Sequence, residues 1–230
     1  DVYKRQALAR WPTEQGYCPP DKFIPVAEEA GLIGELGFYI AQHAIHSLPR
    51  LQRLQPELAL NINLSVKQLL HAELIGQMCE LVDGHRLSRQ SVHFELTESA
   101  FSESLELLQE QVHNLVAAGF DLHLDDFGTG YSSLQRLQSL PMSALKLDKS
   151  FTRLLSEGDE RIVNVILSLG QQLQMSVIAE GVETHWQKDR LRALGCHLMQ
   201  GYLFGRPMPE QQLLEWLQQH AAAPVLPLET

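Results

Sequence analysis

Short apolar segments recur along the chain, and each of them ends in a polar or charged residue. The segments read LALNINLS, SVHFELTES, FDLHLDDFG, ALKLDKS, MSVIAEGVET and CHLMQGY. Their polar ends follow one another at intervals of about 20 to 34 residues, which is the length of a strand and a returning helix. The pattern therefore predicts six strands, each with a polar side chain at its carboxyl end.

The sequence between these strands repeats apolar residues at the spacing of a helix. The clearest predicted helices span residues 33–48, 105–118 and 161–173. Gly119, Gly170 and Gly195 stand where helices should stop, as glycines beyond a helix C-terminus do. Alternation of strands and helices predicts an α/β protein with a largely parallel sheet and helices outside it.

Strands with polar carboxyl ends favour a (β/α) barrel, because in that fold the site is built at one face from several strand ends. A doubly wound open sheet is the alternative, but it would more usually show a glycine-rich phosphate loop after its first strand. The sequence shows no such loop. We interpret QALARW as the end of a seventh strand and expect an eighth to lie upstream of this chain.

Four acids and one amide stand at successive predicted strand ends. They are Asn63, Glu95, Asp125, Asp126 and Glu180. One such acid is more often a helix cap or a surface residue, but four on one rim would repel each other unless a cation lay among them. Oxygen ligands without a His or Cys cluster favour Mg²⁺ or Mn²⁺, and two such ions clamp a phosphate and activate water.

Two further groups of residues face the same interior. Lys146 is interpreted as orienting that water or offsetting charge in the transition state, with a salt bridge to one of the acids as the alternative. His93 and His123 have the strand parity of Glu95 and Asp125, so we expect them to point into the barrel. An interior histidine with satisfied hydrogen bonds is favoured over a catalytic one.

Composition narrows the possible partners and compartment. The net charge of -10 argues against a binder of DNA or RNA, which would need a basic face. Cys18, Cys79 and Cys196 form no CxxC pair, which indicates free thiols in a reducing compartment. No apolar run reaches the roughly 18 residues of a membrane span. We therefore expect a cytoplasmic domain, and a membrane anchor in the parent protein is compatible with that.

Eight longer stretches occur in the order of one known bacterial family and cover residues 7 to about 217. They are ALARW, FIPVAEEAGLI, NINLS, FELTES, DDFGTGYSSLQRL, LPMSALKLDKSF, VIAEGVET and QGYLFGRPMP. In these the chain resembles the EAL-domain cyclic di-GMP phosphodiesterases. The resemblance implies a modified TIM (β/α)8 barrel, here without its first strand, that hydrolyses cyclic di-GMP to linear pGpG with two Mg²⁺ or Mn²⁺ ions.

The resemblance also implies roles for single residues. The positions that match the family's metal ligands are Asn63, Glu95, Asp125, Asp126 and Glu180. Lys146 matches its water-activating lysine, and Gln200 an active-site glutamine. Glu98 resembles the glutamate that steadies the loop after DDFG, a loop tied to dimerisation in the family. Glu183 and Arg10 resemble substrate contacts, at a guanine and at a phosphate.

The chain departs from the family at its start. The namesake tripeptide Glu-Ala-Leu, whose Glu is a metal ligand, reads Gln6-Ala7-Leu8 here. A native Gln6 would be a poorer ligand for a hard cation, which predicts a cyclic di-GMP receptor signalling through dimerisation. We favour the other interpretation, in which residues 1–6 are a non-native remnant, residues 7–219 the EAL-type domain and residues 220–230 a flexible tail.

Three expectations concern the whole protein. A missing strand would leave unpaired sheet edges, so the truncated chain alone is expected to be inactive or poorly soluble. Its parent is expected to form a homodimer and to have room for a sensory or diguanylate cyclase-like domain upstream. An unrelated Mg²⁺-dependent barrel enzyme is a third interpretation, and it rests on fold analogy alone.

Overall fold

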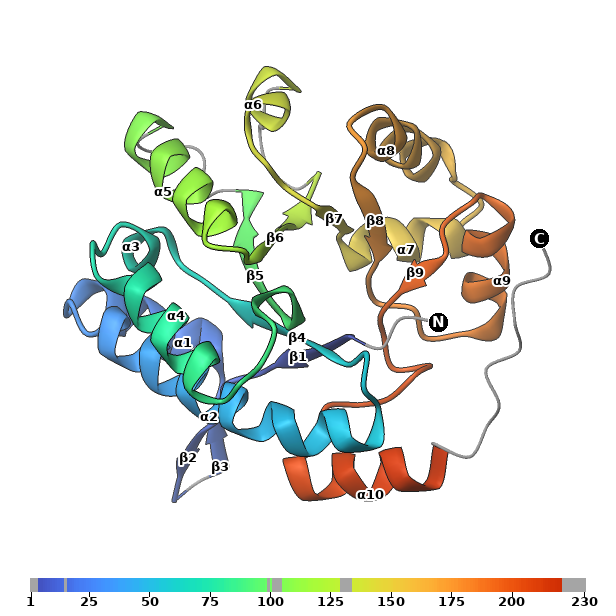
Figure 1. Ribbon diagram of the computed structural model, residues 1–230. Coiled ribbons are helices and arrows are strands. Elements are labelled where there is room, and N and C mark those ends of the chain that lie inside the picture. Colours follow the sequence, from blue (N-terminus) through green and yellow to red (C-terminus); the bar gives the residue numbers. More distant parts are fainter. Residues whose placement is uncertain (1–3, 15, 99, 101–104, 129–133, 221–230) are drawn as a thin grey trace.

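A computed structural model describes residues 4–14, 16–98, 100, 105–128 and 134–220 of the chain. Seven parallel strands form one sheet in the order β1-β4-β5-β6-β7-β8-β9, and Figure 1 shows this sheet curling with helices outside it. The strands are β1 (Lys4–Ala7), β4 (Ala59–Asn63), β5 (Val92–Thr97), β6 (Asp121–Phe127), β7 (Ala144–Leu147), β8 (Ser176–Ala179) and β9 (Leu198–Met199). The six predicted strands and the seventh at Gln6 are all present, which confirms the barrel-like interpretation over the open sheet.

Helices fill most of the connections between these strands. They are α1 (Pro20–Glu29), α2 (Ile33–Leu54), α3 (Val66–Leu69), α4 (Leu74–Gly84), α5 (Leu105–Ala117), α6 (Leu134–Ser139), α7 (Lys149–Ser156), α8 (Arg161–Gln172), α9 (His185–Ala193) and α10 (Glu210–His220), with a short 3₁₀ turn at Arg89–Ser91. None of the helices in the described ranges is long and apolar enough to cross a bilayer.

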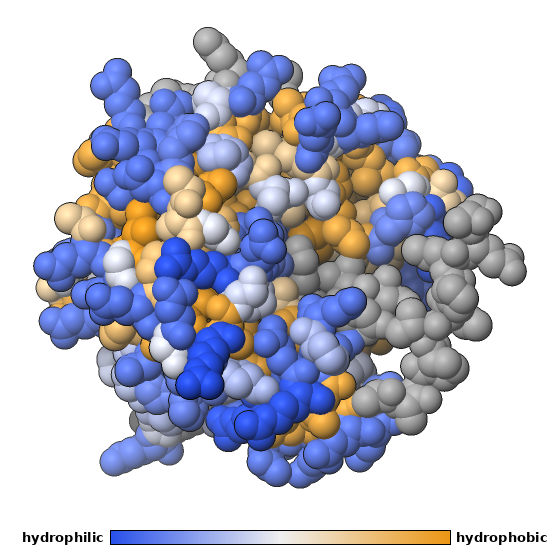
Figure 2. Space-filling model, viewed as in Figure 1, coloured by the Kyte–Doolittle hydropathy of each residue, from blue (hydrophilic) through white to orange (hydrophobic). Residues whose placement is uncertain are grey.

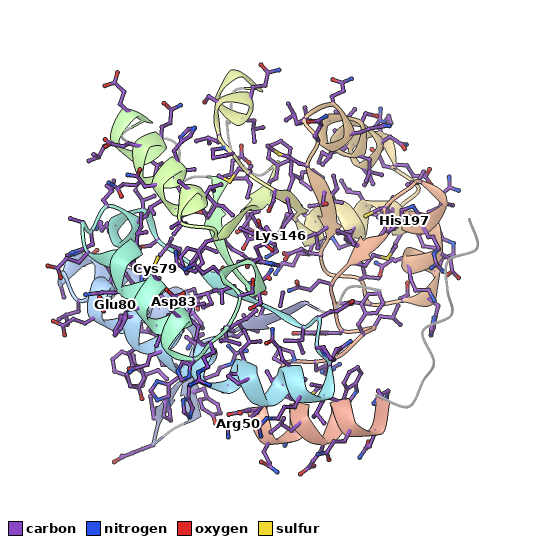
Figure 3. All side chains as sticks on the ribbon, viewed as in Figure 1. Arg50, Cys79, Glu80, Asp83, Lys146 and His197 are labelled. Carbon is purple, nitrogen blue, oxygen red and sulfur yellow. The ribbon has the colours of Figure 1, made fainter. Side chains whose placement is uncertain are left out.

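Two smaller features complete the outer layer. Strands β2 (Trp11–Thr13) and β3 (Gly16–Cys18) form a separate antiparallel hairpin. Helix α10 lies along α2, and Arg50 Nη2 pairs with Glu210 Oε1 at 2.8 Å between the two helices (Figures 1 and 3). The end of the predicted domain is thereby packed against its longest helix. Residues 221–230 of the predicted tail lie outside the described residues.

Glycines end two helices as predicted but not the third. Gly119 and Gly195 follow α5 and α9 with φ of +95° and +92°. Gly170 instead lies inside α8, where a Cβ would come within 2.3 Å of Val177 Cγ2 on β8. It is needed for the close approach of helix to strand, and Gln174 makes the left-handed turn with φ of +57°.

The strands separate an apolar layer from a polar interior. On β5 the apolar Phe94 is buried toward the helices and meets Phe120 edge-on at 5.3 Å between ring centroids, whereas His93 and Glu95 alternate with it and face inward. Hydrophilic side chains cover much of the surface seen in Figure 2, with apolar ones showing between them. The main apolar core thus lies between sheet and helices, which leaves the barrel interior for polar groups.

The turn after β9 gives a test of this close packing. Gly201 has φ of +158°, and a Cβ there would lie 2.2 Å from the carbonyl oxygen of Val182. We expect Gly201→Ala to lower the free energy of unfolding by about 3 kcal/mol, because two backbone segments must separate. Gly195→Ala is the control, because Gly195 also has a positive φ, of +92°, but has open space around it, and this change should cost about 1 kcal/mol. Equal losses in urea denaturation would contradict the steric explanation.

Candidate active site

Lys146 lies at the meeting point of the polar strand ends. It comes from β7, and its side chain is 1% exposed. Its Nζ lies 2.9 Å from Glu95 Oε2, 2.9 Å from Asp125 Oδ1 and 2.8 Å from Glu180 Oε1. Figure 3 shows Lys146 inside the ring of strands. Lys146 therefore forms the salt bridge that was the alternative interpretation, and it does so with three acids rather than one.

The charge balance fixes the protonation of Lys146. Burial alone would lower the pKa of Lys146, but the carboxylates of Glu95, Glu180 and Asp125 outweigh burial and raise that pKa. Lys146 is therefore an ammonium at neutral pH. It donates hydrogen bonds to the three acids.

One ammonium does not balance the acids around it. Burial raises the pKa of Glu180 to about 7, although Lys146 opposes this. Burial also raises the pKa of Glu95, again against Lys146. The pKa of Asp126 is raised by burial and by the neighbouring charge of Asp125. The site therefore holds more negative charge than its own residues neutralise.

A β-bulge turns the two adjacent aspartates toward the same place. Side chains next to each other in a regular strand point to opposite faces. The pairing of β6 with β7 shifts between Leu124 and Phe127, and Asp126 takes the left-handed region with φ of +54°. Carboxylate oxygens of Asp125, Asp126 and Glu180 consequently lie within 4.8 Å of one another. The strand runs on to Phe127, so the acids lie before its end rather than at it.

Gln6 joins the first strand of the sheet to the last. Its Nε2 donates a hydrogen bond to Glu95 Oε2, and its Oε1 accepts one from Gln200 Nε2 at 2.8 Å. Gln6 also pairs in register with Asn61 of β4. Position 6 and Gln200 thus both lie beside the acids, as a ligand and an active-site residue would.

A family comparison decides the identity of this fold and site. The EAL domain family model matches residues 1–207. This chain belongs to the EAL-domain family.

Two relatives show how far the likeness extends. The oxygen sensor protein DosP of Escherichia coli is 38% identical over 100% of this chain, and the bifunctional diguanylate cyclase/cyclic di-GMP phosphodiesterase MucR of Pseudomonas aeruginosa is 38% identical over 91% of it.

The match covers 28% of DosP and 31% of MucR, so this EAL domain spans less than a third of either relative. Solved structures agree with the fold. The MucR phosphodiesterase in complex with c-di-GMP has a TM-score of 0.86 at 37% identity, over 93% of this chain and 88% of that one. The manganese/cy-diGMP complex of Klebsiella pneumoniae BlrP1 has a TM-score of 0.79 at 28% identity, over 91% and 53%.

The residues of this EAL domain fit a divalent cation. Asp125, Asp126 and Glu180 offer three carboxylate oxygens within reach of one ion, and oxygen donors suit hard cations such as Mg²⁺ and Mn²⁺. A cation would also favour the charged forms of Glu180 and Asp126, whose pKa values are raised by burial and by the neighbouring charge of Asp125. Asn63 is exposed at the end of β4 and pairs in register with Glu95, so it lies on the same rim.

The other predicted residues of the EAL domain divide into two groups. Glu98 is buried, and its Oε2 accepts a hydrogen bond from Gly128 N at 2.8 Å, which ties the end of β5 to the turn after β6. Arg10 and Glu183 are exposed and are outside the ion pairs of Lys146. Arg10 Nη1 donates to the carbonyl of Ala9. Substrate contacts by Arg10 and Glu183 stay predictions, as does the remnant interpretation of residues 1–6, of which 1–3 lie outside the described residues.

Sequence reasoning missed Asn61, which contacts the acid cluster directly. Asn61 is 2% exposed, and its Nδ2 donates to Glu95 Oε1 at 2.6 Å. The signal was available in NINLS, because Asn61 and Asn63 are two residues apart and so face the same side of the strand.

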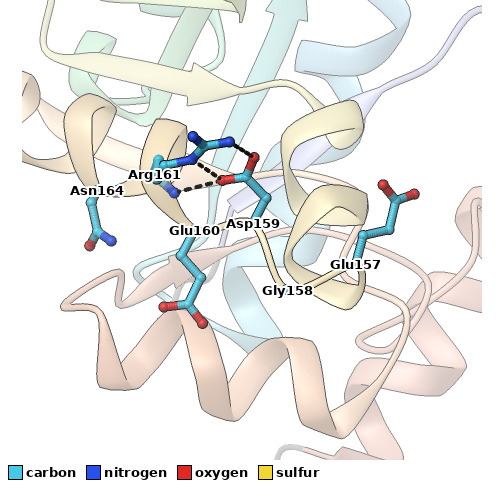
Figure 4. Close-up of a pocket in the computed structure, with 6 residues that line it drawn as sticks. All are labelled: Glu157, Gly158, Asp159, Glu160, Arg161 and Asn164. Atoms are coloured by element: carbon cyan, nitrogen blue, oxygen red, sulfur yellow. Dashed lines mark hydrogen bonds and ion pairs between the residues drawn. The ribbon is translucent and has the colours of Figure 1, made fainter.

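A surface hollow of about 500 Å³ lies apart from these strand ends, at the turn between α7 and α8 (Figure 4). It is lined by Glu157, Gly158, Asp159, Glu160, Arg161 and Asn164. Asp159 pairs with Arg161 and Glu160 pairs with Arg190. Two of its three acids are thus paired with arginines, and it contains none of the predicted site residues.

The metal-free EAL domain should lose stability as the pH rises from about 5 to about 8. The folded-state pKa of Glu180, about 7, lies above its ordinary value of 4.5, so ionisation costs more in the folded state across that window. In EDTA at pH 8 we expect Glu180→Gln to be more stable than the wild type by up to about 3 kcal/mol. The two should converge at pH 4.5 in urea denaturation.

The exposed Glu183→Gln serves as the matched control and should follow the wild type at both pH values. A Glu180→Gln variant with the wild-type pH dependence would show that this carboxylate does not carry the excess charge.

Proposed function

We propose that this EAL domain is a metal-dependent phosphodiesterase that hydrolyses cyclic di-GMP to linear pGpG. The convergence of Glu95, Asp125 and Glu180 on Lys146, with Asp126 turned to the same place, supports this most strongly. Such an excess of buried negative charge suits a site that recruits cations and, through them, a phosphate. The c-di-GMP complex of the related MucR phosphodiesterase supports the choice of substrate.

The grouping of Asp125, Asp126 and Glu180 supports a proposal for the metal ligands. We assign the metal ligands to Asn63, Glu95, Asp125, Asp126 and Glu180. Two Mg²⁺ or Mn²⁺ ions held there would polarise the scissile phosphate and lower the pKa of the attacking water. The manganese-bound neighbour BlrP1 supports this choice of ion.

Lys146 serves this reaction as a fixed cation. Its Nζ lies within hydrogen-bond distance of Glu95, Asp125 and Glu180, to which it donates. It orients the attacking water and offsets the negative charge that grows on the phosphate in the transition state. Its three carboxylate partners hold the ammonium in place, so little reorganisation is needed during the reaction.

The rim residues would contact the nucleotide. We assign a phosphate to Arg10, a guanine to Glu183 and the active-site amide to Gln200, which lies against Gln6. Glu98 steadies the turn after β6 through Gly128 N, and we connect that turn with formation of a homodimer. An upstream sensory or diguanylate cyclase-like domain is proposed for the parent protein, since DosP and MucR both extend far beyond the matched region.

Hydrolysis should depend on Asp125. With Mn²⁺ present, we expect Asp125→Asn to reduce formation of pGpG by at least about a thousandfold, because it removes a carboxylate from the phosphate-binding rim. Chromatography of the nucleotide products measures this. Asp189→Asn, on the exposed face of α9, is the matched control and should keep wild-type turnover.

Both variants are compared in a Gln6→Glu background, because an amide at position 6 is a weaker ligand for a hard cation than a carboxylate. A folded, Mn²⁺-loaded Gln6→Glu protein that binds cyclic di-GMP but forms no pGpG would refute the hydrolase.

One observation favours a second function, a cyclic di-GMP receptor. Gln6 places a neutral amide beside Glu95 where the family has a carboxylate, and an amide is a weaker ligand for a hard cation. Retained nucleotide binding without turnover would leave the domain to signal through dimerisation.

Substitution at position 6 separates the two functions. We expect Gln6→Glu to raise the rate of pGpG formation at least tenfold, because it restores a charged ligand beside Glu95. Calorimetry should show similar affinity for cyclic di-GMP in both proteins. Binding by both proteins with no hydrolysis by either would favour the receptor. The exposed Gln138→Glu is the control for a general effect of added charge.

A further inference from the structure

A polar cluster occupies the barrel interior beneath the acids. Asn61, His93 and His123 come from the adjacent strands β4, β5 and β6, and each is at most 4% exposed. Barrel interiors of this kind are usually filled by branched apolar side chains. Burial of polar groups opposes folding unless they are hydrogen-bonded. The bonds within this cluster therefore indicate what the polar side chains are for.

Asn61 connects the cluster to the active site. Its Nδ2 donates to Glu95 Oε1 at 2.6 Å and lies 3.4 Å from His123 Nδ1, while its Oδ1 lies 3.1 Å from His93 Nδ1. The ring centroids of the two histidines are 4.8 Å apart. Contacts on both the oxygen and the nitrogen of the Asn61 amide leave it one orientation.

His93 anchors this arrangement at the other end of the strands. Its Nε2 lies 3.0 Å from the carbonyl oxygen of Gln90 and 3.5 Å from Asp121 Oδ2, at the start of β6. A continuous set of polar contacts thus runs from Gln90 and Asp121 through His93 and Asn61 to Glu95. Such a set holds the last carboxylate more rigidly than a single bond would.

We propose that Asn61 is a positioning residue that fixes the Glu95 carboxylate for metal binding, with His93 fixing the Asn61 amide. The inference rests on the proposed function. Lys146 and Gln6 both contact Oε2 of Glu95, and Asn61 contacts Oε1. Loss of Asn61 frees Oε1 and lets the carboxylate rotate. Hydrogen-bond partners of ligating groups typically change metal affinity or activity about 10- to 100-fold when they are lost.

Binding of Mn²⁺ tests the proposal without relying on turnover. We expect Asn61→Leu, which is similar in size but has no amide, to weaken Mn²⁺ binding about 10-fold or more. Electron paramagnetic resonance of free Mn²⁺ gives the dissociation constant. Asn61→Ser should show the same direction and is the second variant if the leucine prevents folding. Ile62→Ala, next to it on the apolar face, should lower stability and leave Mn²⁺ affinity unchanged.

A double-mutant cycle shows whether Asn61 acts through Glu95. In a Glu95→Gln background the further change Asn61→Leu should alter Mn²⁺ affinity less than about twofold. An undiminished effect in that background would overturn the proposal, as would wild-type affinity in a folded Asn61→Leu protein. Absence of Mn²⁺ binding by the wild type would overturn it together with its premise. Mn²⁺ binding without hydrolysis by the Gln6→Glu protein would refute the hydrolase alone.

Discussion

The ion pairs of Lys146 are the interaction on which the site depends. One buried ammonium holds Glu95, Asp125 and Glu180 within hydrogen-bond distance, although the first two lie in β5 and β6 and the third follows β8. The remaining negative charge can be neutralised by a proton or by a cation. The raised pKa of Glu180 favours the protonated form of this carboxyl group. Metal binding and protonation therefore compete for the same carboxylates, and folding is linked to both.

Much of this arrangement could be predicted from the sequence, because it follows from the spacing of apolar residues in strands, with a period of 2, and in helices, with a period of about 3.6. Alternation at period 2 gave the strands and their polar ends, and parallel strands bring such ends to one rim. The errors arose where a distant contact decides the local structure. Gly170 is required by Val177 on the next strand, not by a helix end. The left-handed turn at Asp126 belongs to a bulge that no residue spacing reveals.

The identity of residue 6, with a neutral amide or a charged carboxylate, changes the charge balance of the whole site. An amide nitrogen there donates to Glu95 and stabilises the carboxylate without any added charge. A carboxylate oxygen in the same place would bring another negative charge beside Glu95, and Lys146 already serves three acids. The glutamate form would therefore depend more strongly on bound cations than the glutamine form. A glutamate at position 6 would favour the enzyme, and a glutamine would favour the receptor.

The interior polar cluster limits how the Glu95 carboxylate can change its hydrogen-bond partners, whichever residue occupies position 6. Asn61 holds Oε1 from inside the barrel through a neutral bond that no change of charge at the rim removes. Oε2 is shared by Lys146 and Gln6, whose contacts depend on the charge around them. Exchange of partners is thus confined to Oε2, the oxygen that faces the acids. A barrel interior filled with apolar side chains would pack as well, but it would leave Oε1 without its hydrogen bond to Asn61.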